Sequence, residues 1–128
     1  MSLLENFKPF NFKEGVPCVS VTNNGITFNK SVIMKLDYPE YVVLLIDDKS
    51  KRIAIQTCTQ ETPNAVAFYN KDKRSNTLNV RWNGRDLLNT LKNMMGWDLS
   101  KCGYRADGML LEDEHAMLFD LSTAIELK

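Results

Sequence analysis

The chain has 128 residues, of which 44% are hydrophobic and 25% charged, a composition typical of a folded globular domain and not of a disordered chain. Sixteen basic residues balance sixteen acidic ones, which excludes polyanion binding driven by overall charge, so that a nucleic-acid or lipid contact would need a local basic patch. Cys18, Cys58 and Cys102 are far apart and odd in number, which predicts reduced, mostly buried thiols and neither a disulfide framework nor a zinc site. No apolar stretch approaches the roughly 20 residues of a membrane span. The first residues do not have the pattern of a secretory signal, and we expect a cytoplasmic protein.

The N-terminal part predicts an arm followed by two strands. Residues 1–15 are expected to form an extended arm that packs its aromatic side chains on the body, the alternative being an aromatic arm that stacks on bases or docks a partner. Apolar and polar residues then alternate over 19–22 and 26–29, on either side of an Asn-Asn-Gly turn. This pattern predicts two antiparallel strands. The aromatic residues of the arm are Phe7, Phe10 and Phe12.

A short helix is expected next, from about residue 31 to residue 37. The side chain of Asn29 or Ser31 can accept a hydrogen bond from the free N–H groups of its first turn. Pro39 stops the helix, because a residue that precedes proline disfavours helical geometry.

A hairpin follows the helix. The run from Val42 to Ile46 is apolar without interruption, which predicts a strand that is buried on both faces or lies at the core of a dimer. The polar residues 47–51 form the expected tip, and residues 52–57 return as an alternating strand.

The second half of the chain repeats this order of elements. A connection with one short strand precedes it, and the following strand, helix and hairpin have the same succession as in the first half. The helix carries an apolar stripe and is expected to be capped by Asn83 and ended by Gly96. The expected elements are strands at 65–69 and 78–81, a helix over 83–96, and strands at 104–111 and 116–121.

These patterns predict one compact α+β domain over residues 1–128, rich in strands and built from two strand–helix–hairpin units. A unit of about forty residues is too small to bury its own apolar face, so we expect two units, in tandem or from two chains, to interlock their hairpins into one core. An ordinary α+β domain with a single mixed sheet is the alternative. The divisions are the arm at 1–15, the first unit at 16–60, a connection at 61–76 and the second unit at 77–128.

Residues 19–57 resemble the swapped-hairpin barrel of AbrB-type and MraZ-type proteins, and residues 78–121 resemble it loosely. The resemblance implies an oligomeric or tandem barrel that binds DNA and regulates transcription, and MraZ-type chains carry two such units. The family has Arg or Gln after the turn glycine where this chain has Ile26, so only Lys30 and Lys35 lie near the DNA-contacting positions. The matching segments are Val19-Ser20-Val21, Asn24-Gly25, Ile26-Thr27-Phe28, Val32 to Leu36, Tyr41 to Asp47 and Arg52 to Gln56.

A second group of cations lies around the start of the second unit. Strand alternation places Arg81 on the face opposite Trp82, where its guanidinium can contact phosphates or guanine edges. A solvated surface explains the same residues, and this alternative stays open. The candidate nucleic-acid-binding residues are Lys30, Lys35, Lys71, Lys73, Arg74, Arg81 and Arg85.

No constellation of residues predicts an enzyme. His115, the only histidine, lies in an acidic tip that a solvated turn explains. The acidic tips lack the twelve-residue calcium loop, and the glycines form no phosphate loop. We therefore expect no catalytic residue, no metal, no cofactor, no small-molecule substrate and no membrane contact. The expected partner is duplex DNA, with a homo-oligomer as a further expectation; the alternative is a protein-interaction or assembly module that binds no nucleic acid.

Overall fold

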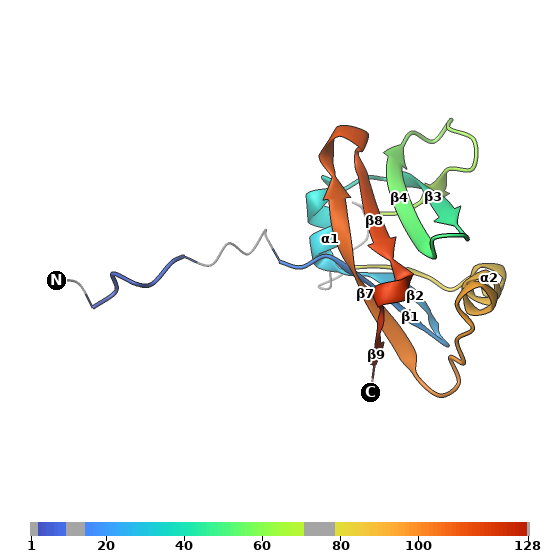
Figure 1. The fold of residues 1–128 in the computed structure, drawn as a ribbon. Helices are drawn as coiled ribbons and strands as arrows, with labels where there is room; N and C mark the ends of the chain where they lie inside the picture. Colours follow the sequence, from blue (N-terminus) through green and yellow to red (C-terminus); the bar gives the residue numbers. More distant parts are fainter. Residues whose placement is uncertain (1–2, 10–14, 71–78, 128) are drawn as a thin grey trace.

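The computed structural model describes residues 3–9, 15–70 and 79–127. In this part of the chain, nine strands form one sheet that curls into a half-barrel, with two helices packed against it (Figure 1). The predicted strand-rich α+β class is therefore confirmed. The strands are β1 (Cys18–Thr22), β2 (Gly25–Phe28), β3 (Tyr41–Asp47), β4 (Arg52–Cys58), β5 (Val66–Ala67), β6 (Val80–Trp82), β7 (Gly103–Leu111), β8 (Ala116–Asp120) and β9 (Ile125–Leu127). The helices are α1 (Lys30–Lys35) and α2 (Arg85–Met95), with single-turn 3-10 segments η1 (Glu112–Glu114) and η2 (Leu121–Thr123).

The strands follow one another across the sheet in the order β5-β3-β4-β8-β7-β1-β2-β6, with β9 beside β7. Neighbouring strands are antiparallel throughout this order. β5 and β6, the two ends of this order, come close to each other. The indole N–H of Trp82 in β6 donates to the carbonyl oxygen of Ala67 in β5 at 3.2 Å. A side chain thus bridges the gap that the backbone ladder leaves open.

The two halves of the chain interleave in the sheet. The hairpin of β3 and β4 lies between β5 and β8, and the hairpin of β7 and β8 lies between β1 and β4. Leu45 and Met109 occupy matching places in the two hairpins, 64 positions apart (45 to 109), as do Ala54 and Leu118 (54 to 118). Ala54 and Leu118 are themselves directly opposite each other, at the junction of β4 and β8. The pairing therefore has an approximate two-fold pattern around this junction.

Helix α1 begins at the expected cap and ends two residues earlier than expected. The side-chain oxygen of Asn29 accepts a hydrogen bond from the backbone N–H of Val32 at 3.3 Å. The helix ends at Lys35 and not at residue 37, because Asp37 and Tyr38 have φ of 62° and 54°. These values lie in the left-handed region, which cannot continue a right-handed helix.

Helix α2 has the predicted apolar stripe but a different cap. Gly84, and not Asn83, occupies the N-cap position, where no side-chain hydrogen bond is made. Gly96 ends the helix with φ of 70°, as expected for a left-handed C-terminal residue. Leu88 and Leu91 are buried in the common core. Neither α1 nor α2, the two α-helices of the described residues, is long and apolar enough to cross a membrane.

Strand β3 is not buried on both faces in the single chain. The side chains of Leu45 and Ile46 are 45% and 41% exposed. β5 pairs only with Tyr41 and Val42, so among the residues that the structure describes the rest of β3 has no neighbouring strand on that side. Burial on both faces was therefore a wrong prediction for these two residues, because an apolar run alone does not say whether a strand lies inside a sheet or at its edge. The dimer alternative stays a prediction.

One aromatic cluster joins the two halves of the sheet. The ring of Phe28 contacts the rings of Trp82, Phe68 and Phe119 at centroid distances of 5.0, 5.4 and 5.7 Å. Phe28 and Phe119 are completely buried, and they come from strands at opposite ends of the chain. Trp82, which is partly buried, thus packs against the core.

The N-terminal arm extends away from the body over residues 3–9 (Figure 1). Phe7 is 73% exposed, so the prediction that it packs on the body is wrong. Phe10 and Phe12 lie outside the described residues. Further along, Ser31 in α1 is buried, and its hydroxyl donates to the carbonyl oxygen of Gly15.

Candidate nucleic-acid interface

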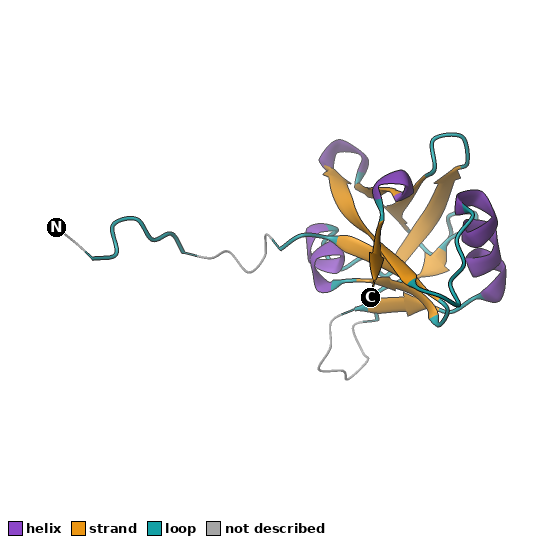
Figure 2. Cartoon of the chain, turned by 60° about the horizontal axis from the view of Figure 1, so that its bottom comes forward, coloured by secondary structure: helices purple, strands orange, loops and turns teal. Residues whose placement is uncertain are grey.

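The described cations among the predicted site residues do not form one patch. Lys30 and Lys35 are in α1, Arg81 is in β6 and Arg85 is the first residue of α2. The two overall views agree that α1 and α2 lie on opposite sides of the folded body (Figures 1 and 2). The predicted residues Lys71, Lys73 and Arg74 lie outside the described part of the chain.

Arg81 is aligned instead with an arginine that the sequence did not single out. Arg81 of β6 is opposite Thr27 of β2, which is opposite Ser20 of β1, which in turn is opposite Arg105 of β7. We call these four residues the arginine row. Most of the residues that flank its members along the strands are buried, and the other two, Trp82 and Tyr104, are half-buried against the core, so the row lies on the outer face of the sheet. Both arginines are exposed. Because adjacent strands are about 4.8 Å apart, the backbones of the two arginines are separated by about 14 Å.

Hydrogen bonding orients one end of the arginine row. The Nε–H of Arg81 donates to the Thr27 hydroxyl at 3.3 Å, which lays the side chain across β2. This bond occupies Nε and leaves the terminal nitrogens for an acceptor outside the protein. Within residues 3–9, 15–70 and 79–127, neither arginine of the row forms an ion pair. The row can therefore offer two unpaired guanidinium groups with two hydroxyls between them.

Cys18 lies beside the row but is not activated as a nucleophile. It is directly opposite Asp107, which is two residues from Arg105 on the same strand. Burial raises the pKa of the Cys18 thiol; the Arg105 guanidinium opposes this shift and the Asp107 carboxylate adds to it. A reactive cysteine needs a lowered pKa. The three cysteines are free thiols of intermediate exposure, and thus less buried than expected.

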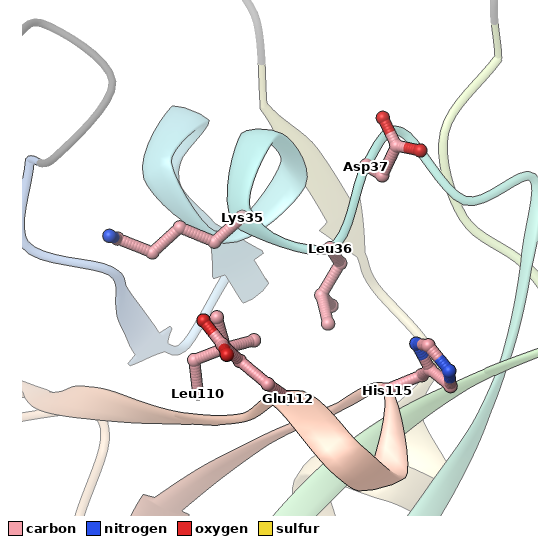
Figure 3. Close-up of a pocket in the computed structure, with 6 residues that line it drawn as sticks. All are labelled: Lys35, Leu36, Asp37, Leu110, Glu112 and His115. Carbon is pink, nitrogen blue, oxygen red and sulfur yellow. The ribbon is translucent and has the colours of Figure 1, made fainter.

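A hollow of about 270 Å³ lies between α1 and the tip of the β7–β8 hairpin. In Figure 3, Leu36 points into this hollow between Glu112 and His115, while the Lys35 amine and the Asp37 carboxylate point in different directions. The side chains therefore form no convergent acid–base pair, and His115 is an exposed turn residue with φ of 51°.

A second hollow, of about 530 Å³, has the matching position between α2 and the tip of the β3–β4 hairpin. Its hairpin residues correspond to those of the first hollow at the same separation of 64 positions (48 to 112 and 51 to 115). No group of three His, Cys, Asp or Glu residues that could hold a metal ion occurs in the part of the chain that the structure describes. The hairpin residues that line this second hollow are Ile46, Asp48 and Lys51, and the α2 residues that line it are Thr90, Asn93 and Met94.

Comparisons with known proteins found no match: no family model, no curated protein and no solved structure matches the chain. The resemblance to AbrB-type and MraZ-type proteins therefore remains a prediction from the residues that carry it. Arg105 could not have been found by local pattern, because its partner strand β1 lies more than eighty positions earlier in the chain (20 to 105). Its only signal in the sequence is its alternate position in a predicted strand.

Proposed function

We propose that this protein binds nucleic acid, and duplex DNA in particular, through the arginine row. The observation that carries the proposal is the placement of Arg81 and Arg105 on one exposed row of the sheet. Duplex DNA carries one negative charge per about 1.7 Å of its axis, so a row of about 14 Å faces several phosphates at once. Guanidinium groups can bind phosphate with two parallel hydrogen bonds, and hydroxyls such as those of Thr27 and Ser20 commonly add contacts.

The strand pairing supports a swapped-hairpin arrangement as part of this proposal. The β7–β8 hairpin is flanked on both sides by strands of the first unit, and the β3–β4 hairpin is flanked by β8 of the second unit and by β5 of the connection. A single unit is too small to bury its own apolar face. The implied relation to AbrB-type and MraZ-type regulators is an analogy of fold, and the function is argued from the arginine row. On this proposal the protein acts in the cytoplasm as a regulator-like module without catalysis.

The test is a titration of a labelled random-sequence duplex at about 50 mM salt, where phosphate contacts are strong. The variant R81E/R105E should lose binding, because it places two carboxylates where phosphates are expected. The matched control is K30E/K35E, which makes the same change in net charge on α1 and should retain most of the affinity. Circular dichroism establishes that both variants are folded.

Three results would contradict the proposal. If the unaltered protein does not bind the duplex, the nucleic-acid function is wrong. If K30E/K35E abolishes binding and R81E/R105E does not, the contact surface is α1 and not the arginine row. If both variants lose affinity equally, the effect comes from net charge and not from a particular surface.

A second candidate function is that of a protein-interaction module. Leu45, Ala54, Leu118 and Met109 are opposite one another across β3, β4, β8 and β7, and we call them the apolar row. The side chains of Leu45 and Met109 are 45% and 59% exposed. Single exposed apolar residues are ordinary, but a contiguous row on a sheet is characteristic of an interaction surface.

A further inference from the structure

We propose that the free edge of β3 pairs with the same edge of a second copy of the chain, giving an antiparallel homodimer centred on Leu45. This inference rests on the interaction role and is independent of nucleic-acid binding. In this dimer, β3 of a second copy covers the edge of β3 that the single chain leaves unpaired. The dimer would extend one sheet across both copies.

The edge of β3 differs from the other edges of the sheet. β5 covers it only at Tyr41 and Val42, and no other strand of the described residues pairs with residues 43–47 on that side. The edge strands β5, β6 and β9 have only two, three and three residues. Natural proteins protect long edges with charges, prolines or bulges, because unpaired N–H and C=O groups recruit other strands. Residues 43–46 of β3 contain neither a charge nor a proline.

The free run is self-complementary. In an antiparallel pair around a two-fold axis at Leu45, the two Leu45 side chains are opposite each other on the outer face. Leu44 of one copy is then opposite Ile46 of the second copy on the inner face, and Val43 is opposite Asp47. Leu45 and Ile46, the two residues whose exposure contradicted the predicted burial, are thereby covered from the open side. A different centre would shorten the pairing, because β5 blocks the run at Val42.

Charge and space are compatible with this register. Asp47 is paired with Arg52 within its own hairpin at 3.5 Å, and it meets the uncharged Val43 of the second copy. The two Asp47 residues lie four positions apart along the paired strands, or about 14 Å, so they do not repel each other strongly. On the inner side, the hollow of about 530 Å³ separates Ile46 from Met94 of α2, so the helix does not fill the space beside the edge.

Sedimentation equilibrium over a range of protein concentrations tests the inference. The unaltered chain should change from its 14.7 kDa monomer toward twice that mass as concentration rises. L45K should remain monomeric under conditions in which the unaltered protein is dimeric, because a lysine on an edge strand opposes pairing. The control M109K makes the same kind of change at the far end of the apolar row and should dimerise normally. Thermal unfolding establishes that both variants are folded.

Hydrogen exchange identifies the pairing mode. Amides within residues 43–47 should exchange more slowly at dimeric than at monomeric concentrations, while those of β6 and β9 should not change. Loss of the dimer in M109K would contradict edge pairing and indicate packing through the apolar row. An unaltered protein that stays monomeric at all concentrations would overturn the inference. That result would not bear on the binding of DNA or of a different protein, which are tested separately.

Discussion

The outer face of the sheet carries two rows of residues, one charged and polar and the other apolar. The arginine row crosses β6, β2, β1 and β7, and the apolar row crosses β3, β4, β8 and β7. β7 belongs to both rows, supplying Arg105 to the first and Met109 to the second. Gly108 lies between these two residues in sequence. It is the first residue of β7 that pairs with β8, whereas residues 104–107 pair with β1.

The inner and outer residues of these strands have different roles. The inner residues of both halves form one apolar core, in which Phe28 and Phe119 are in contact. The outer residues are not needed for that core, so the polar ones can serve a charged ligand and the apolar ones a protein surface. We therefore expect the two rows to be separable by mutation, although they depend on the same core.

The largest expected effect comes from the shared core. Phe28→Ala should lower the free energy of unfolding by about 3–5 kcal/mol, because it removes a fully buried ring that contacts three other rings. Urea denaturation measures this loss, and both rows should lose function together. Phe7→Ala is the control: its ring is 73% exposed, and the change should stay within about 0.5 kcal/mol. Equal effects of the two substitutions would contradict the description of the core.

A smaller effect is expected where the two rows meet. A Cβ atom at Gly108 would lie 2.8 Å from Cε1 of Phe119 and 2.9 Å from Sδ of Met117, closer than packed atoms tolerate. Gly108→Ala should therefore cost on the order of 1–3 kcal/mol in unfolding experiments. Gly84→Ser is the matched control, since nothing lies within 4 Å of a Cβ there and serine suits an N-cap. A stable Gly108→Ala protein would show that β7 can shift without cost.

The smallest effect is expected at Asp47, which lies two residues from Leu45 of the apolar row in β3. Hydrogen bonds from Ser50, followed by those from Lys49 and Arg52, lower the pKa of Asp47 below its ordinary value of 3.8. A lowered pKa in the folded state means that the carboxylate stabilises the fold above about pH 4, and that this contribution is lost as pH falls through the lowered pKa. Asp47→Asn should therefore melt at a slightly lower temperature at pH 7. The difference from the unaltered protein should shrink at about pH 2, and a difference independent of pH would contradict the assigned cause.

Local patterns predicted most of the elements. Alternation identified β1 and β2, the apolar stripe identified α2, and the repeated order of strand, helix and hairpin indicated a strand-rich fold. These features depend on residues close together in the chain, which is why sequence periodicity detects them. The last residue of α1 and the first of α2 were less predictable, because the positive φ of Asp37 and the capping by Gly84 depend on backbone geometry.

The arrangement of the rows could not be predicted in the same way. Arg81 was selected as a site residue, but its alignment with Arg105 requires the ladders β6–β2, β2–β1 and β1–β7. Such long-range pairings leave no trace in local periodicity. The exposure of Leu45 was missed for the same reason, since only the length of β5 determines how much of β3 is an edge.

The most direct test of the arginine row is the salt dependence of duplex binding. The logarithm of the association constant should be measured against the logarithm of salt concentration between about 50 and 200 mM, for the unaltered protein and for R81A/R105A. Each phosphate contact contributes about 0.9 to the slope, so losing two contacts should make the slope shallower by about 1.8. An unchanged slope in the variant would contradict the claim that these two arginines bind phosphate.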